Sequence, residues 1–246
     1  MILVWILVST FLVTLLSLIG IFTLSLKQNF LEKILFCLIG FSAGALIGSA
    51  FLHILPEVLE KTKSEFTFYW LILGIVLFFS MERYFYWRHC HEGVCDVHAF
   101  TYLNLIGDGL HNFVDGMVIA ASFMVSIKLG VVTTLAVIFH EIPQELGDFG
   151  VLIYGGFSKQ KALFYNFISA LTAMVGAIVG YFASNIASGF SNFILPLTAG
   201  GFIYIASSDL IPQIHKESNL RRSTLAFIAF LSGIAFMALA RTCFSP

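Results

Sequence analysis

Two stretches of the chain concentrate cation-binding groups within otherwise apolar surroundings. The first reads GDGLHNFVDGM at 107–117 and the second reads FHEIPQELGDFG at 139–150. Residues three or four apart share one face of a helix, so each stretch places imidazole, carboxylate and amide groups along one stripe. The stripes comprise Asp108, His111, Asn112 and Asp115 in the first stretch, and His140, Glu141, Gln144, Glu145 and Asp148 in the second. Five of the 14 acidic residues of the chain lie in these two stretches.

Imidazole, carboxylate and amide groups together form a ligand set for a borderline divalent cation. Such a set suits Zn²⁺ and Fe²⁺, its oxygens extend the choice to Mn²⁺, and the lack of a thiolate at this depth argues against Cu(I). Five ionised carboxylates facing one another would repel, so either some carry protons or a divalent cation lies among them. Two alternatives stay open: the helices could simply pair their polar groups, or the groups could form a proton pathway. We favour a divalent-metal site.

Pro143 interrupts the second stretch. Proline has no N–H, so the carbonyl of Phe139 loses its helical partner. A free carbonyl in mid-membrane suits a cavity that holds an ion or water. We therefore expect the Phe139 carbonyl to face such a cavity.

The composition places these groups in a membrane. Of 246 residues, 59% are hydrophobic and 11% are charged, against about 25% charged in soluble domains, and the mean hydropathy is +0.93. This composition excludes a soluble or a disordered chain, and a net charge of −1 argues against a nucleic-acid partner. Four scattered cysteines are too few for a disulfide scaffold. We predict an all-α membrane protein that forms a single polytopic domain over residues 1–246.

Eight transmembrane helices are predicted, because about 20 apolar residues cross a bilayer. They fall near 1–26, 34–55, 66–87, 99–124, 129–155, 160–183, 193–214 and 223–243. The fourth and fifth spans carry the two polar stretches near their middles. These spans run antiparallel, so we expect the two stretches to meet at one depth.

Basic residues predict the orientation of the spans. One side collects nine of them: Lys27, Lys33, Arg83, Arg88, Lys159, Lys161, Lys216, Arg221 and Arg222. The other side collects four: Lys61, Lys63, Lys128 and Arg241. This asymmetry predicts that both termini lie outside the cytosol and that the loop 88–98 lies within it.

An internal repeat relates the second span to the seventh. A shift of 156 residues superposes Ser42, Ala43, Gly44, Ile47, His53 and Pro56 on Thr198, Ala199, Gly200, Ile203, Asp209 and Pro212. The two spans run in opposite directions, and inverted repeats are common in secondary transporters. We predict an inverted repeat of spans 1–3 and 6–8 around central spans 4 and 5, with chance similarity of two small-residue helices as the alternative.

Other polar groups have less specific settings. The loop HCHEGVCDVH could hold Zn²⁺ in a weak capture or sensing site, or it could be a plain solvated loop; its candidate ligands are His89, Cys90, His91, Cys95 and His98. His53 and Asp209 could line the transport path or make capping and interface contacts. We interpret Glu82 as an interfacial charge, and we expect Asn166 and Ser169 to bond between helices rather than line the site.

The motifs HNFVDG at 111–116 and HEIPQELGDF at 140–149 resemble the signature of the ZIP (Zrt/Irt-like) metal transporters. The similarity is greatest to the subgroup with the patterns HNFxDG and HExPHExGDF. FLHILPE in span 2 and TAGGFIYIA in span 7 also resemble the family. The resemblance implies import of a divalent metal, zinc foremost, across a cell membrane toward the cytosol, often by a homodimer.

The family's ligands fall on His111, Asn112 and Asp115 in span 4 and on His140, Glu141 and Gln144 in span 5. Gln144 departs from the subgroup, which has His there, and this weakens the case for a second tightly bound metal and for exclusive zinc selectivity. Asp108, Glu145, Asp148 and His53 remain candidates for the path or for support of the ligands.

An enzyme is the rival interpretation. His140-Glu141-x-x-Gln144 approaches HExxH, the zinc-protease motif that has two His ligands and a Glu base. An intramembrane zinc metalloprotease would need a second His at Gln144 and a regular helix at Pro143. We therefore favour a non-enzymatic transporter.

Overall fold

The computed structural model describes residues 1–23, 28–62, 65–87, 97–154, 156–186 and 189–243. Every regular element within these ranges is a helix, as expected for apolar segments that must satisfy their own backbone hydrogen bonds in lipid. The elements are α1 (Ile2–Leu15), η1 (Leu16–Ile19), α2 (Gly20–Thr23), α3 (Gln28–Ser49), η2 (Ala50–Ile54), α4 (Leu55–Thr62), α5 (Phe66–Trp87), α6 (Val97–Val125), α7 (Ile127–Tyr154), α8 (Lys159–Ala170), α9 (Thr172–Ile186), α10 (Phe190–Tyr204), η3 (Ile205–Leu210), α11 (Ile211–His215) and α12 (Leu220–Cys243).

Several spans consist of consecutive elements. The second runs through α3, the π-helix η2 and α4, and the seventh runs through α10, the π-helix η3 and α11. The sixth divides into α8 and α9 at Leu171. A π-turn inserts one residue into a helix and often marks a functional position. The hydropathy pattern predicted the positions of these spans but not their interruptions, and the helices of the second span extend beyond the predicted 34–55 to 28–62.

Six helical segments of the described chain are both long and apolar enough to cross a membrane. They are Ile2–Ile19, Phe36–Glu60, Phe66–Arg83, Lys159–Ile186, Phe190–His215 and Leu220–Arg241. The eight-span count is therefore not confirmed by length and composition. The two remaining long helices are α6 and α7, with 29 and 28 residues, and they carry the two acidic stretches.

Tight connections join consecutive helices. Ser126 alone separates α6 from α7, and its hydroxyl accepts a hydrogen bond from the Leu129 amide at 3.1 Å, which caps the start of α7. Gly189 precedes α10 with a φ of 100°, a conformation that glycine adopts without a Cβ clash. Short connections make these neighbouring helices antiparallel.

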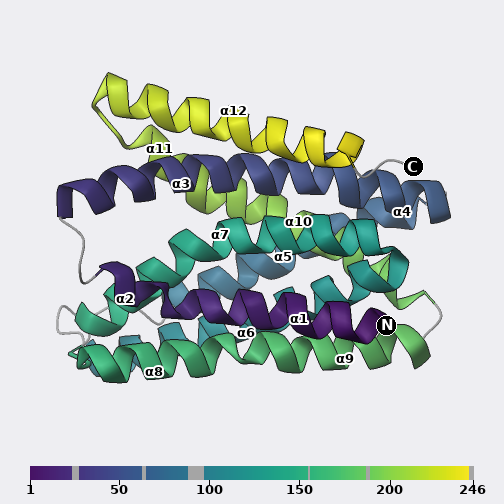
Figure 1. Ribbon diagram of the computed structural model, residues 1–246, viewed down its shortest axis with the longest axis horizontal. Coiled ribbons are helices and arrows are strands. Elements are labelled where there is room, and N and C mark those ends of the chain that lie inside the picture. Colours follow the sequence, from purple (N-terminus) through teal and green to yellow (C-terminus); the bar gives the residue numbers. More distant parts are fainter. Residues whose placement is uncertain (24–27, 63–64, 88–96, 155, 187–188, 244–246) are drawn as a thin grey trace.

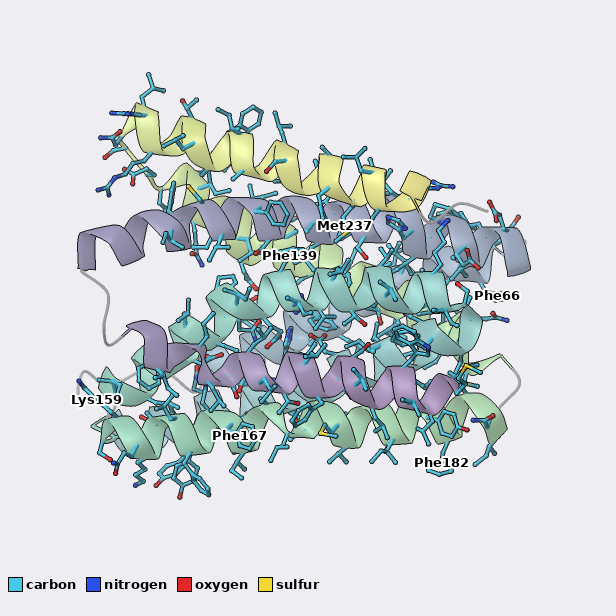
Figure 2. The ribbon with its side chains drawn as sticks, viewed as in Figure 1. Phe66, Phe139, Lys159, Phe167, Phe182 and Met237 are labelled. Carbon is cyan, nitrogen blue, oxygen red and sulfur yellow. The ribbon has the colours of Figure 1, made fainter. Side chains whose placement is uncertain are left out.

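The bundle places α7 at its centre (Figure 1). The α3 and α12 helices lie side by side along one edge, whereas α6 and α9 pack together at the opposite edge. Small residues permit the second contact, because a Cβ on Gly176 would meet the Phe113 carbonyl carbon at 2.8 Å. Large apolar side chains such as Phe182 point away from the bundle (Figure 2), where lipid would cover them.

Candidate metal centre

The two polar stretches meet inside the bundle, as the sequence predicts. His111 and Asp115 lie one turn apart on α6, and His140 and Glu141 lie on the facing part of α7. One potential ligand atom from each of these four residues lies within 4.8 Å of all the others. All four side chains are buried, with between 0% and 6% of their surface exposed. We call these four residues the metal centre.

Acceptor atoms converge at this centre. His140 Nε2 lies 3.0 Å from Asp115 Oδ2 and 3.3 Å from Glu141 Oε1. His111 Nε2 lies 3.3 Å from the same Glu141 oxygen and 3.2 Å from His140 Nε2. Like-charged oxygens and two ring nitrogens at such separations require a shared positive charge. Two imidazoles with two carboxylates form a four-ligand set suited to Zn²⁺.

Contacts around the centre fix the orientation of His140. Its Nδ1 lies 3.1 Å from the Ala136 carbonyl one turn earlier. A carbonyl only accepts, so Nδ1 carries the hydrogen and a neutral ring presents the Nε2 lone pair to the centre. Metal-binding histidines usually have such a second hydrogen bond, which sets the tautomer and raises ligand basicity.

Aromatic rings form the apolar walls of the centre. The Phe202 ring contacts His140 at a centroid distance of 5.6 Å, and the Phe78 ring contacts His111 at 6.0 Å. These rings come from α10 and α5, so four helices enclose the ligands. A water-poor wall strengthens the interaction between a cation and its ligands.

The amide residues have different environments. Asn112 is fully buried, and its Nδ2 donates to Asp108 Oδ1 at 2.8 Å, while its own Oδ1 makes no hydrogen bond within the described chain. Gln144 lines a cavity together with His111 and His140. The ligand roles of Asn112 and Gln144 therefore stay predictions.

A cavity of about 860 Å³ reaches the two histidines of the centre. Its α6 wall comprises Asn104, Gly107, Asp108 and His111, and its α7 wall comprises His140, Pro143, Gln144, Leu146, Gly147 and Asp148. The cavity therefore extends from the histidines toward the start of α6 and the end of α7. Its described lining includes four acidic residues, Glu82, Asp108, Asp148 and Asp209, and no lysine or arginine. The cavity is thus suited to a cation.

Comparison with known proteins identifies the family. The family model described as ZIP Zinc transporter matches residues 2–93 and 88–241. The chain belongs to the ZIP zinc transporter family. This membership confirms the resemblance to the family and decides against the intramembrane metalloprotease, because the family is one of transporters.

Relatives within the family align over most of this chain. A protein named zinc transporter ZIP13 from Pongo abelii is 35% identical over 219 residues, which cover 82% of this chain and 65% of the relative. The zinc transporter ZIP13 of Danio rerio is 31% identical over 82% of this chain and 74% of its own. Zinc transporter SLC39A7 of Rattus norvegicus is 38% identical over 58% of this chain and 32% of its own. The chain thus spans about two thirds or less of the first and third of these relatives.

The Phe139 carbonyl is not placed as the sequence predicts. Pro143 removes its helical partner, but the Ser42 hydroxyl of α3 donates to this carbonyl, and Phe139 is not among the residues that line the large cavity. Figure 2 shows Phe139 on the side of α7 that faces α3. A side chain on a neighbouring helix can satisfy a carbonyl freed by proline. The prediction failed because a lone helix gives no information about its neighbours.

The secondary candidates separate into three places. Asp108, Asp148 and Asp209 line the large cavity, whereas His53 lines a pocket of about 190 Å³ at the other end of the bundle. The loop ligands His89, Cys90, His91 and Cys95 lie outside the described residues, as does the His98 side chain. The loop prediction therefore stays untested.

Hydrogen bonds between helices account for two residues as expected. Asn166 on α8 donates to Glu145 Oε2 at 2.5 Å and to the Ser17 carbonyl at 3.3 Å, and Ser169 donates to the Leu105 carbonyl at 3.0 Å. Glu145 is 1% exposed and does not line the large cavity.

Sequence reasoning did not anticipate two contacts of the exposed Glu82. It accepts a hydrogen bond from Tyr204 and it lines the large cavity, while its interpretation as an interfacial charge stays a prediction. It also missed Asn104, whose Nδ2 donates to Asp148 Oδ1 at 2.8 Å across the α6–α7 contact. The helical period places Asn104 on the same face as Asp108, four residues on, so the signal was present in the sequence.

Proposed function

We propose that this protein transports a divalent metal cation, zinc foremost, across a membrane toward the cytosol. The convergence of His111, Asp115, His140 and Glu141 at the end of an acid-lined cavity carries the proposal. Asn112 and Gln144 complete the ligand shell in this proposal. Two nitrogens and two carboxylates suit Zn²⁺ and also accept Fe²⁺ and Mn²⁺. The relatives' names as zinc transporters support the same first choice.

Eight crossings by a single polytopic domain over 1–246 are part of this proposal. At 1.5 Å per residue, α6 and α7 are each about 40 Å long, which is sufficient to cross a bilayer. Four of their five acids belong to the metal centre or line the cavity, and the fifth, Glu145, accepts a hydrogen bond from Asn166, which makes charged groups tolerable at that depth. The start of α1 and the end of α12 lie at the same end of the bundle (Figure 1), as an even number of crossings requires.

Packing supports an inverted repeat. A Cβ on Gly44 of α3 would strike the Phe230 carbonyl of α12, and a Cβ on Gly200 of α10 would strike the Leu71 carbonyl of α5. Gly44 and Gly200 are 156 residues apart in the sequence. The reverse contacts show the same spacing: a Cβ on Gly233 would meet the Phe41 carbonyl, and a Cβ on Gly74 would meet the Leu197 carbonyl, 156 residues further on. The α3–α12 and α5–α10 contacts thus involve equivalent positions, with a shift of 156 residues between α3 and α10 and of 159 residues between α5 and α12.

The two π-helices also coincide under this repeat. Residues 50–54 of η2 shift by 156 onto 206–210 of η3, and His53 in η2 then matches Asp209 in η3. Asp209 lines the large cavity, whereas His53 lines the small pocket at the opposite end and donates to the Met237 carbonyl at 2.8 Å. Two equivalent positions are in unequal surroundings, as in one state of an alternating-access transporter.

In this proposal the structure is the inward-facing state. The excess of basic residues assigns the cavity end of α6 and α7 to the cytosol and both termini to the outside. Lys159 lies at the end of the bundle opposite the N-terminus (Figure 2), in agreement with that assignment. The outward-facing state would widen the pocket around His53 and close the cavity around Asp209. The proposed setting is a cell membrane and the proposed assembly is a homodimer, as the family resemblance implies.

Uptake into proteoliposomes tests the function. Purified protein is reconstituted with a metal-sensitive dye inside, and Zn²⁺, Fe²⁺ and Mn²⁺ are supplied in turn outside. His140→Ala removes one nitrogen ligand and should abolish most uptake, while His215→Ala, a change of the same kind at an exposed position of α11, should leave it unchanged. Wild-type rates for His140→Ala at matched reconstitution would contradict the proposal.

A further inference from the structure

Two carboxylates lie in the cavity beyond the metal centre. Asp108 precedes His111 by about one turn on α6, and Asp148 follows Glu141 by about two turns on the antiparallel α7. Both displacements lead away from the metal centre toward the same end of the bundle, and both residues line the cavity. An ion that leaves the centre through this cavity must therefore pass them.

One oxygen of each carboxylate is held by an asparagine. Asn112 donates to Asp108 Oδ1 at 2.8 Å, and Asn104 donates to Asp148 Oδ1 at 2.8 Å. The second oxygen of each, Oδ2, is buried and makes no hydrogen bond within the described chain. Ser169 lies beside Asp108, but its single hydroxyl hydrogen donates to the Leu105 carbonyl. The amides thus orient two carboxylates and leave one oxygen of each available.

The electrostatics of this pair favour a cation. Asp108 is 5% exposed, and no lysine or arginine is among the described residues that line the cavity. Two buried anions without a cationic partner are costly, and each raises the cost of the other. A divalent cation between the free oxygens would remove both penalties at once.

We propose that Asp108 and Asp148 form a second cation station, made of oxygen ligands only, which receives the metal as it leaves the metal centre. Its ligand class is a divalent cation that accepts carboxylate oxygens, such as Mn²⁺ or Zn²⁺ in transit. The station lacks imidazole, so it binds Zn²⁺ more weakly than the centre does. A weaker site on the way out promotes release, because a transported ion must bind and also leave. Its role in release rests on the proposed transport function, whereas its binding of metal does not.

The test counts Mn²⁺ ions bound by the full chain in lipid nanodiscs, by equilibrium dialysis with electron paramagnetic resonance of the free ion. Asp108→Asn combined with Asp148→Asn keeps the side-chain shape and should bind one equivalent fewer than wild type. Glu65→Gln is the control, because it removes an exposed carboxylate that does not line this cavity and should lose none. An unchanged stoichiometry in the double variant would overturn the station.

A Co²⁺ titration shows whether the double variant is still folded at the metal centre. Co²⁺ bound to two imidazoles in a four-coordinate site absorbs strongly in the visible range, and this band should persist in the double variant and disappear in His140→Ala. A double variant that keeps the band and loses one Mn²⁺ supports the station. Loss of the band together with the metal would mean that the two acids only maintain the fold, which would overturn the proposal.

Asn104→Ala tests the orienting amide without removing a charge. Asp148 would lose the one hydrogen bond that its carboxylate accepts within the described chain, and the last equivalent of Mn²⁺ should bind about 10-fold more weakly. Unchanged affinity would contradict the proposed geometry. The station and the transport function can be refuted separately. If the double variant takes up Zn²⁺ normally and still binds as many Mn²⁺ ions as wild type, only the station is refuted. If the wild type binds Mn²⁺ but transports no metal, only the transport function is refuted.

Discussion

Alanine in place of Gly44 or Gly200 tests whether the two halves of the bundle share one packing scheme. The added Cβ of Gly44→Ala would overlap the Phe230 carbonyl and approach Ile234 N at 3.1 Å, and that of Gly200→Ala would overlap the Leu71 carbonyl and approach Ile75 N at 3.0 Å. The opposing atoms are backbone, which cannot rotate aside as a side chain does. Each substitution must therefore push a pair of helices apart.

The expected cost follows from three contributions. Overpacking costs about 1–3 kcal/mol, and loss of close C–H···O contacts adds about 0.5–1 kcal/mol. The higher helix propensity of alanine offsets about 1 kcal/mol of this destabilisation. The net loss of unfolding free energy is about 0.5–3 kcal/mol for either variant, which would lower the Tm by up to about 10 °C. Because the two contacts are equivalent, we expect Gly44→Ala and Gly200→Ala to lower the unfolding free energy by similar amounts.

Thermal unfolding of the purified protein in detergent, followed by tryptophan fluorescence, measures both losses. Gly150→Ala is the control, because no atom lies within 4 Å of a Cβ at that position on α7, and its Tm should stay constant or rise. If Gly200→Ala unfolds at the temperature of Gly150→Ala, the close α5–α10 contact is wrong. If Gly44→Ala is destabilised and Gly200→Ala is not, the halves do not share their packing.

Three further changes address selectivity, gating and the loop. Gln144→His should bind Zn²⁺ more tightly and discriminate more strongly against Mn²⁺ in competition uptake, because imidazole is the better Zn²⁺ donor; an unchanged ratio would remove Gln144 from the ligand shell. His53→Leu loses the hydrogen bond to the Met237 carbonyl, worth about 1 kcal/mol, and should make opening of the small pocket easier by that amount. A thiol reagent should therefore label a cysteine introduced at Leu129, in the same pocket of a cysteine-free background, about 5-fold faster, and an unchanged rate would exclude a gating role for His53. Serine at all five His and Cys positions of 89–98 should alter apparent affinity or regulation but retain uptake; complete loss in correctly inserted protein would mean that essential ligands lie there.

The sequence was sufficient to predict the metal centre because its determinants are local. Helical spacing places His111 and Asp115 on one face, and the short connection at Ser126 makes α6 and α7 antiparallel neighbours. Once two polar faces must avoid lipid, they can only face each other or a cavity. His140 and Glu141 are consequently brought to the same depth without information from any other helix.

Features that depend on more distant helices were not predictable in this way. The Ser42 bond to the Phe139 carbonyl joins positions 97 residues apart, and its formation depends on how α3 is rotated against α7. The lining of the large cavity also combines residues of α3, α5, α10 and η3 with those of α6 and α7, and hydropathy does not encode how these helices meet. A helical period of 3.6 residues in the sequence also gives no sign of the π-turns, although the predicted internal repeat aligns the two positions at which they occur.

The Ser42 bond connects α3 to the part of α7 that carries the candidate metal centre. Ser42 lies on α3, two residues before Gly44, where α3 packs against α12, while Phe139 directly precedes the proposed ligand His140. Pro143 makes this link available, because a regular helix would have kept the Phe139 carbonyl for itself. Displacement of α3 relative to α7 would therefore act on the backbone next to a metal ligand. In the proposed alternating-access cycle, the irregularity in α7 would thus couple a movement of α3 to the backbone beside a proposed metal ligand.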